Sequence, residues 1–198
     1  MTRFYRFILK SLGWIMYAFF FMKVENKDNI PKTGNYIILS NHVSAWDPFT
    51  IAVSGKFRFR PMAKKELYRN RFVAFLLKKV GSIKVDRTDG AQALAYARKA
   101  LERKETMLIF PEGTRSRTRE LLDFKAGAFA LAIKTRTPVL PCQVILKKRM
   151  SLFCGVRVRF GNLLQPEELE FEEGNSNYER SMELIRSKFL ELRRDDMP

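Results

Sequence analysis

Residues 36–48 read YIILSNHVSAWDP, and this stretch predicts both the fold and the position of a candidate site. The apolar run from Tyr36 to Leu39 is short and uninterrupted, which is typical of a strand buried on both faces of a sheet. The run ends in Ser40-Asn41-His42, and Pro48 indicates that a helix begins after the turn. A buried strand followed by a turn and a helix is the repeating unit of α/β proteins.

The same unit recurs along the rest of the chain. We expect further strands near residues 57–62, 82–85, 106–110, 138–146 and 156–160, and helices after Pro48 and near 70–80, 90–103, 125–134 and 178–193. This alternation predicts an α/β fold: a single domain with a central, largely parallel sheet flanked by helices. Ligands gather at the carboxyl ends of such strands. Three polar clusters are expected at that edge, namely Asn41-His42, Asp86-Arg87 and 112–116.

Length and composition limit the possible classes of protein. A chain of 198 residues with 46% hydrophobic residues has enough apolar material for one globular domain. Cys142 and Cys154 are the only cysteines and lack CxxC spacing, so we expect a reducing compartment and no disulfide framework. With one histidine and two scattered cysteines, the sequence predicts no metal site.

The net charge of +16 implies an anionic partner, which is nucleic acid, acidic lipid, or a phosphorylated substrate or carrier. The charge is uneven along the chain. Residues 56–87 carry eleven Lys or Arg against two acids, whereas residues 167–173 carry five glutamates and no base. No pattern of a recognisable nucleic-acid fold is present, so we expect no nucleic acid partner.

Residues 3–22 read RFYRFILKSLGWIMYAFFFM and predict a helix that lies at a membrane surface. Arg3, Arg6 and Lys10 fall in one sector of a helical wheel, and large apolar side chains fall opposite. The uncharged part, 11–22, would span roughly 18 Å as a helix, short of the roughly 30 Å hydrocarbon core. It is therefore expected to lie in the interface. A buried core helix and a secretory signal peptide are the alternatives, although no small-x-small cleavage site follows.

His42 is the single histidine of the chain, so it is the one candidate for a histidine base. Pro48 disfavours helical geometry at Asp47, which lets the chain curl and the carboxylate reach the imidazole. The other ring nitrogen would then face outward as a general base. An ordinary loop histidine, with Asp47 capping the helix, is the alternative. These two residues alone leave both interpretations open.

Gly113, Thr114 and Arg115 follow a predicted buried strand and suit an anion. A glycine lets the backbone approach the ligand closely, threonine supplies a hydroxyl, and arginine offers a planar fork that matches phosphate. A surface turn with a solvated arginine explains the same residues when they are taken alone.

Taken together, four ordered blocks resemble the glycerolipid acyltransferase family, which includes 1-acyl-glycerol-3-phosphate acyltransferase. The blocks are NHVSAWD (41–47), GSIKVDR (81–87), FPEGTRS (110–116) and TPVLPC (137–142). Residues 63–67 (AKKEL) and 124–127 (FKAG) are similar to elements that link these blocks in the family. The resemblance covers roughly residues 35–145. Spanning helices that precede the first block in larger relatives have no counterpart in residues 1–30.

The resemblance implies a function for each block. His42 would be the base and Asp47 its orienting partner, matching the family's histidine-x4-aspartate. The residues implied to bind the phosphate of the acceptor are Lys64, Arg87, Glu112, Gly113, Thr114 and Arg115. The family moves an acyl group from acyl-CoA or acyl-carrier protein to the free hydroxyl of 1-acyl-glycerol-3-phosphate, which forms phosphatidic acid, with no metal and no cofactor beyond the donor. We therefore expect a membrane-associating helix over 1–30 and an acyltransferase domain over 31–198, on an anionic membrane surface at the cytoplasmic face.

Three alternatives stay open at this point. The acceptor could instead be glycerol-3-phosphate or another lyso-lipid, with the same chemistry. A covalent mechanism would use Cys142 or Ser44 as nucleophile, although no GxSxG pattern surrounds Ser44. A non-enzymatic basic module would bind anionic surfaces by charge alone, and its binding would collapse with salt. Acyl chain length, the choice of donor and the oxyanion stabiliser are not predicted.

Overall fold

The computed structural model describes residues 3–55, 57, 59, 62–79, 82–85, 90–147, 154–169 and 178–193. The strands are β1 (Lys23–Glu25), β2 (Ile37–Ser40), β3 (Met62–Lys64), β4 (Ile83–Val85), β5 (Met107–Ile109), β6 (Val139–Leu146) and β7 (Val156–Phe160). The α-helices are α1 (Arg3–Phe19), α2 (Asp47–Gly55), α3 (Arg71–Lys79), α4 (Gly90–Glu102), α5 (Gly127–Lys134), α6 (Pro166–Leu169) and α7 (Glu179–Arg193). The 3-10 helices are η1 (Lys27–Asn29) and η2 (Lys65–Arg69).

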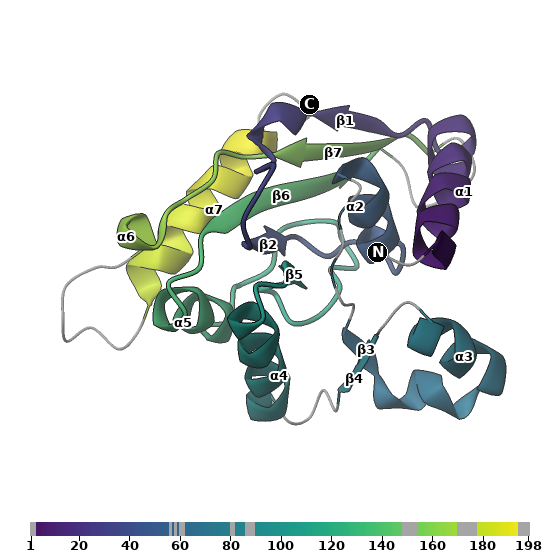
Figure 1. Ribbon diagram of the computed structural model, residues 1–198. Helices are drawn as coiled ribbons and strands as arrows, with labels where there is room; N and C mark the ends of the chain where they lie inside the picture. Colours follow the sequence, from purple (N-terminus) through teal and green to yellow (C-terminus); the bar gives the residue numbers. More distant parts are fainter. Residues whose placement is uncertain are drawn as a thin grey trace.

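Five strands form the central sheet in the order β1-β7-β6-β2-β5, with helices on both faces (Figure 1). β2 lies between β5 and β6 and is parallel to both, with Ile37 opposite Met107 on one side and Val139 on the other. β6 and β7 are antiparallel, and β1 is parallel to β7. The α/β class is therefore confirmed, and the sheet is mixed beyond β6.

The core consists of two layers that the alternation of β2 separates. Ile38 packs with Met16 of α1 and Ile51 of α2 on one face. Ile37 and Leu39 pack on the other face against apolar side chains of α4, α5, α6 and α7. Because both faces are covered, β2 can be apolar at successive positions, which explains the uninterrupted run in the sequence.

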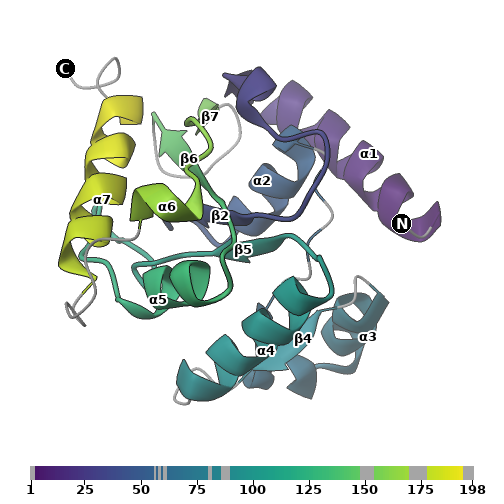
Figure 2. The same cartoon turned by 60° about the vertical axis from the view of Figure 1, so that its left-hand side comes forward.

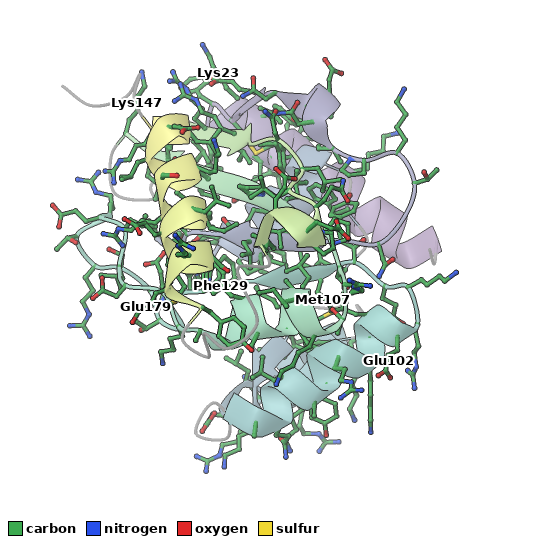
Figure 3. The ribbon with its side chains drawn as sticks, turned by 90° about the vertical axis from the view of Figure 1, so that its left-hand side faces the viewer. Lys23, Glu102, Met107, Phe129, Lys147 and Glu179 are labelled. Carbon is green, nitrogen blue, oxygen red and sulfur yellow. The ribbon has the colours of Figure 1, made fainter. Side chains whose placement is uncertain are left out.

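Side chains sort between interior and periphery as this layering requires. Phe129 of α5 lies inside, between its helix and the sheet, and is fully buried (Figure 3). The charged side chains of Lys23, Lys147, Glu102 and Glu179 lie at the periphery in the same view. Burial of large apolar side chains such as Phe129 contributes about 1.5–3 kcal/mol each, so this layer is a main source of stability.

The segment from β3 to β4 stands apart from the central sheet. β3 and β4 pair in parallel with each other and form a separate two-stranded sheet, with α3 between them in the chain. We expect a strand over 57–62 from the sequence, but the strand begins at Met62. Phe59 instead forms an isolated bridge with Thr106 beside β5. The central sheet therefore does not include the strand that precedes Asp86-Arg87, and these two residues lie outside the described part of the chain.

The N-terminal segment is joined to β7, a strand far along the chain. β1 pairs with β7, and both carboxylate oxygens of Glu25 bind arginines of β7, Arg157 at 3.0 Å and Arg159. Sequence patterns did not predict β1, because three residues are too short for a period-two pattern. Among the described residues, no helix combines the length and the apolar character that crossing a bilayer requires.

Candidate active site

The carboxyl ends of β2 and β5 bring two polar segments together. Because these strands are parallel neighbours, Asn41-His42 and the turn after Phe110 leave the sheet at the same edge. The amide of Ser116 donates a 2.8 Å hydrogen bond to the carbonyl of His42. The first and third blocks of the sequence therefore form one site, as the position of the strands predicts.

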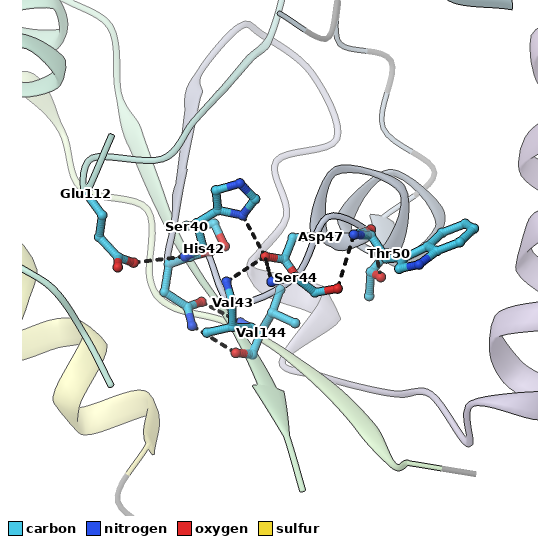
Figure 4. A network of polar contacts seen from close by, with 10 residues as sticks. Ser40, His42, Val43, Ser44, Asp47, Thr50, Glu112 and Val144 are labelled. Atoms are coloured by element: carbon cyan, nitrogen blue, oxygen red, sulfur yellow. Dashed lines mark hydrogen bonds and ion pairs between the residues drawn. The ribbon is translucent and has the colours of Figure 1, made fainter. Parts of the chain in front are cut away.

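His42 and Asp47 are in direct contact (Figure 4). His42 Nδ1 lies 2.8 Å from Asp47 Oδ2, and the two residues are 7% and 1% exposed. The same Oδ2 accepts hydrogen bonds from the amides of Val43 at 2.7 Å and Ser44 at 2.8 Å. The carboxylate is therefore fixed from three directions. If Nδ1 carries the shared proton, Nε2 presents a lone pair.

The capping alternative for Asp47 does not describe this geometry. An N-cap side chain accepts hydrogen bonds from amides two or three residues further along the helix. Asp47 instead binds the imidazole and two amides that precede it in the chain. Its other oxygen, Oδ1, is buried without a hydrogen-bond partner among the described residues.

The imidazole is also held by its flat face. Phe110, which follows β5, stacks on His42 with ring centroids 4.1 Å apart and an interplanar angle of 16°. Stacking on one face and a hydrogen bond at Nδ1 leave the ring little rotational freedom. The position of Nε2 is therefore set before any substrate arrives, which is the arrangement that general-base catalysis needs.

Glu112 joins the loop of His42 to a second loop. Its carboxylate accepts a hydrogen bond from the amide of His42 at 2.9 Å and another from the amide of Leu122 at 3.3 Å. The residue is 3% exposed. Burial raises the pKa of the Glu112 carboxyl, and the two backbone hydrogen bonds oppose this rise. Glu112 thus positions the backbone of His42, and a contact between Glu112 and an acceptor phosphate stays a prediction.

Gly113, Thr114 and Arg115 are all exposed at this turn. Gly113 has a φ of +69°, a conformation that side chains other than glycine rarely adopt. Arg115 directly precedes Ser116, so its side chain begins one residue from the hydrogen bond to His42. The backbone of Arg115 therefore lies next to the loop of His42, and a contact between its side chain and a phosphate stays a prediction.

A second cation at this turn was missed by sequence reasoning. The side chain of Lys125 lies over Gly113, where a Cβ atom would come within 3.0 Å of Lys125 Nζ. The amide of Lys125 donates to the carbonyl of Pro111 at 2.9 Å, which fixes the start of the side chain. The family element FKAG contains this lysine, but a lone lysine between loops carries no spatial signal in a sequence. Only the fold shows that it reaches the turn.

Asn41 also belongs to the site, although the sequence alone predicts no role for it. Its side-chain amide donates to the carbonyl of Val144 at 2.9 Å, and its side-chain oxygen accepts from the amide of Val144 at 2.8 Å. Asn41 therefore extends the pairing of β2 with β6 by one residue through its side chain. This clamp holds the backbone directly before His42.

Lys64 belongs to the separate β3–β4 unit. Lys64 is the last residue of β3 and pairs in register with Val85 of β4. Arg87 lies outside the described residues. Their predicted roles at the phosphate therefore stay predictions, and the structure brings together His42, Asp47 and the turn at 112–116.

The two candidate nucleophiles occupy unsuitable positions. Cys142 is fully buried in β6, and burial raises the pKa of its thiol, which disfavours the thiolate that would attack. The Ser44 hydroxyl accepts a hydrogen bond from the amide of Trp46 at 3.2 Å, and Ser44 is 7% exposed. Neither the buried thiol of Cys142 nor the hydroxyl of Ser44 is therefore placed as a nucleophile that a base activates.

Comparison with known proteins agrees with this geometry. The protein family described as Acyltransferase matches residues 21–145. A 1-acyl-sn-glycerol-3-phosphate acyltransferase of Borreliella burgdorferi is 38% identical over 60% of this chain and 48% of its own length. Another of Bacillus subtilis is 33% identical over 76% of this chain and 80% of its own. The matched region is thus about half of the former protein and most of the latter.

A solved structure has the same architecture over nearly the whole chain. The crystal structure of the 1-acyl-sn-glycerophosphate (LPA) acyltransferase PlsC from Thermotoga maritima aligns with a TM-score of 0.74 at 25% identity. The alignment covers 96% of this chain and 81% of that one. The likeness extends beyond the four sequence blocks and includes the helices around the sheet.

Proposed function

Because the chain belongs to the acyltransferase family, we propose that it transfers a fatty acyl group to the free hydroxyl of 1-acyl-glycerol-3-phosphate and forms phosphatidic acid. The donor is acyl-CoA or acyl-carrier protein. The observation that supports this most strongly is the 2.8 Å contact of His42 with Asp47, beside a turn that carries Arg115. The names of the two bacterial relatives point to the same acceptor.

The proposed reaction is a direct transfer. Nε2 of His42 takes the proton of the acceptor hydroxyl as its oxygen attacks the thioester carbonyl. The resulting imidazolium is stabilised by the buried Asp47 carboxylate. When the tetrahedral intermediate collapses, the carbon–sulfur bond breaks and the imidazolium returns the proton to the departing thiolate. A positioned base of this kind contributes about 10²–10⁴-fold to the rate.

The acceptor phosphate is proposed to bind at the turn after β5. Arg115 and Lys125 supply cations there, and Lys64, Arg87, Glu112, Gly113 and Thr114 complete the predicted site. Holding the phosphate positions the hydroxyl against His42, which converts an encounter into an effectively intramolecular step. The reaction needs no metal and no cofactor beyond the donor, so transfer should persist in a chelator such as EDTA.

The reaction is proposed to take place on an anionic membrane surface at the cytoplasmic side. Exposed aromatic side chains of α1 support this, with Phe7 and Trp14 67–68% exposed. A helix with such a face binds the interface through apolar burial and through attraction to acidic lipids. The lyso-lipid acceptor would reach the site from the same surface.

A panel of acceptors tests the proposal. Purified protein is incubated with lysophosphatidate, glycerol-3-phosphate or lysophosphatidylcholine, each with acyl-CoA and with acyl-carrier protein, and products are measured by mass spectrometry. We expect phosphatidic acid from lysophosphatidate at the highest kcat/KM. If glycerol-3-phosphate were the one acceptor that reacts, the assigned acceptor would be wrong but the proposed reaction mechanism would stand. A stable acylated protein would support the covalent mechanism, and no transfer to any acceptor would refute the proposed function.

A further inference from the structure

Exposed large apolar side chains are concentrated in three segments of the described chain. These segments are α1 with Phe21 directly after it, the first turn of α2 with Trp46 and Phe49, and the η2–α3 segment. Tyr96 and Leu190 are the exceptions. Scattered exposed apolar residues are normal on a protein surface, but a concentration of them marks an interaction site.

The η2–α3 segment contributes what we define as the α3 face: Leu67, Phe72 and Phe75. Their exposed fractions are 49%, 69% and 54%. Phe72 and Phe75 are three residues apart and therefore share one side of the helix. A helix near residues 70–80 is expected from the sequence, but none of the four sequence blocks lies in it, so it has no predicted role. The proposed reaction does not use it either.

The α3 face is held in its exposed position by local contacts. Asn70 caps the helix, because its side-chain oxygen accepts hydrogen bonds from the amides of Phe72 at 3.0 Å and Val73 at 3.1 Å. The Tyr68 hydroxyl donates to the carbonyl of Ser82 at 3.1 Å, which ties η2 to the chain before β4. The opposite side of the helix, including Val73 and Leu77, is half-buried. The helix therefore has a partner on one side already, and the α3 face points away from it.

Basic side chains surround the α3 face. Lys65, Arg69, Arg71 and Lys78 are all exposed within η2 and α3. Glu66 is the single acid between Lys65 and Lys79. Aromatic side chains flanked by lysine and arginine are typical of segments that lie on an acidic lipid surface, where the rings enter the interface and the cations meet the headgroups.

α1 and α3 lie on the same side of the molecule. Both views of the ribbon show them on one flank, with α2 between α1 and the sheet (Figures 1 and 2). Trp46, which adjoins Asp47, brings exposed aromatic surface next to the catalytic pair. A flat, extended partner can contact all three segments at once.

We propose that the α3 face is a second contact with the surface of an anionic phospholipid bilayer, in addition to α1. The two helices then bracket the His42 site against the lipid from which the acceptor comes. This rests on the proposed function only for the identity of the acceptor, since lipid binding by the α3 face does not require catalysis. An acidic carrier protein is the rival occupant, but it would not account for the exposed aromatic side chains on α1 and at the start of α2.

Vesicle sedimentation with full-length variants tests the proposal. Each protein is mixed with vesicles of phosphatidylcholine alone or with phosphatidylglycerol, and the bound fraction is measured over lipid concentration. Phe72→Ser should weaken binding to the acidic vesicles about tenfold, because a large ring leaves the interface. Leu67→Ser should weaken it less, and Arg71→Gln about fivefold, with the latter loss disappearing in high salt.

Leu190→Ser on α7 is the matched control for Leu67→Ser. The two leucines are 43% and 49% exposed, but α7 lies on the far side of the sheet from α1 (Figure 1). Leu190→Ser should bind vesicles as the wild type does. Equal losses in both leucine variants, or no loss in Phe72→Ser with its circular dichroism unchanged, would overturn the proposal. Weaker binding to carrier protein with unchanged vesicle binding would overturn it in favour of the rival.

Transfer in detergent micelles separates this proposal from the proposed function. Phe72→Ser and Leu67→Ser should retain wild-type kcat with lysophosphatidate dispersed in detergent, because neither residue belongs to the site. One outcome is that these variants lose vesicle binding and that neither they nor the wild type transfer an acyl group. The lipid contact then stands and the proposed function fails. If all transfer normally and all bind vesicles equally, the function stands and the α3 face has no lipid role.

Discussion

The loop after β2 and the α3 face reverse the usual distribution of side chains in opposite ways. His42, Asp47 and Glu112 are polar and buried. Phe72 and Phe75 are apolar and exposed. Burying a polar group is unfavourable unless it is hydrogen-bonded, and exposing apolar surface is unfavourable unless something covers it.

The unfavourable free energy is offset within the chain for the site loop and, as we propose, by a partner for the α3 face. Most polar groups of the buried loop are paired within the chain, because backbone amides bind the carboxylates of Asp47 and Glu112. Asp47 Oδ1 is the exception among the described residues. The side chains of the α3 face stay 49–69% exposed, and the proposed bilayer contact would cover them. The site loop is therefore set before substrate binds, whereas the α3 face would be covered only when it binds the proposed lipid surface.

Removing the base should separate the two regions most sharply. His42→Ala should lower kcat about 10²–10⁴-fold, because no other histidine can take the proton. Its vesicle binding should equal that of the wild type. Transfer is measured from labelled acyl donor, and circular dichroism checks the fold. Near-wild-type turnover would show that the buried loop is structural only.

Asp47→Asn tests whether the buried carboxylate orients and stabilises the base. The side-chain oxygen can still accept from the amides of Val43 and Ser44, but the neutral amide does not stabilise an imidazolium. We expect kcat to fall about 10²-fold or more, with unfolding free energy lower by about 1–3 kcal/mol because an amide donor is buried unpaired. Asp28→Asn, at an exposed position, is the control. Unchanged kcat would return Asp47 to a purely structural role.

Glu112→Gln weakens the link between the two loops of the site. The glutamine oxygen can accept one backbone hydrogen bond, but its amide nitrogen faces the second donor. We expect unfolding in urea to show a loss of about 1–3 kcal/mol. kcat should fall less than in Asp47→Asn, because the imidazole and its carboxylate remain. Glu120→Gln, exposed in the neighbouring loop, should leave both quantities unchanged.

Gly113→Ala tests the approach of Lys125 to the turn. The new Cβ would lie within 3.0 Å of Lys125 Nζ and occupy a positive-φ position. We expect KM for the acceptor to rise a few-fold and stability to fall by about 1–2 kcal/mol. Gly34→Ala is a matched control, because Gly34 also has positive φ but has no atom within 4 Å of its Cβ position. It should lose stability without a change in KM.

The pH dependence of stability should show the smallest effect. Burial raises the pKa of Glu112 above its ordinary value of 4.5, so the folded protein holds this proton more tightly than the unfolded chain does. The contribution of Glu112 to stability is therefore largest below that value and is lost as pH rises through the folded pKa. In Glu112→Gln this decline should be absent from urea unfolding measured across that range. An identical pH profile in both proteins would contradict the assignment.

The sequence predicts the strands of the central sheet well where both faces of the strand are buried. The runs of β2, β5, β6 and β7 are apolar enough to indicate strands, and their expected bounds lie within one residue of the observed ones. β1 was missed because a three-residue strand at the edge carries no periodic pattern. The strand expected over 57–62 begins at Met62, and Phe59, one of the described residues before it, forms an isolated bridge with Thr106. Alternating basic and aromatic residues resemble a strand pattern in the sequence.

The contact of His42 with Asp47 could be predicted because both residues lie within one short segment. His42 and Asp47 are five residues apart, and the chain between them turns before α2 begins at Asp47, so the carboxylate meets the imidazole. The expectation that Pro48 keeps Asp47 from being helical was wrong, because Asp47 is the first residue of α2. Contacts between distant segments could not be predicted in the same way. The bond from Glu112 to the amide of His42, the clamp of Asn41 on Val144 and the reach of Lys125 depend on strand order, which no local pattern encodes.

The pairing of β1 with β7 has a consequence for synthesis on the ribosome. Glu25 and its partner Arg159 are 134 residues apart. At about 5–20 residues per second, roughly 7–27 s separate their appearance in the nascent chain. Throughout that interval α1 has emerged while the strand that anchors its neighbour does not yet exist. Under the proposed membrane contact, α1 has time to meet a bilayer before β7 exists, and the remaining chain would then fold next to that surface.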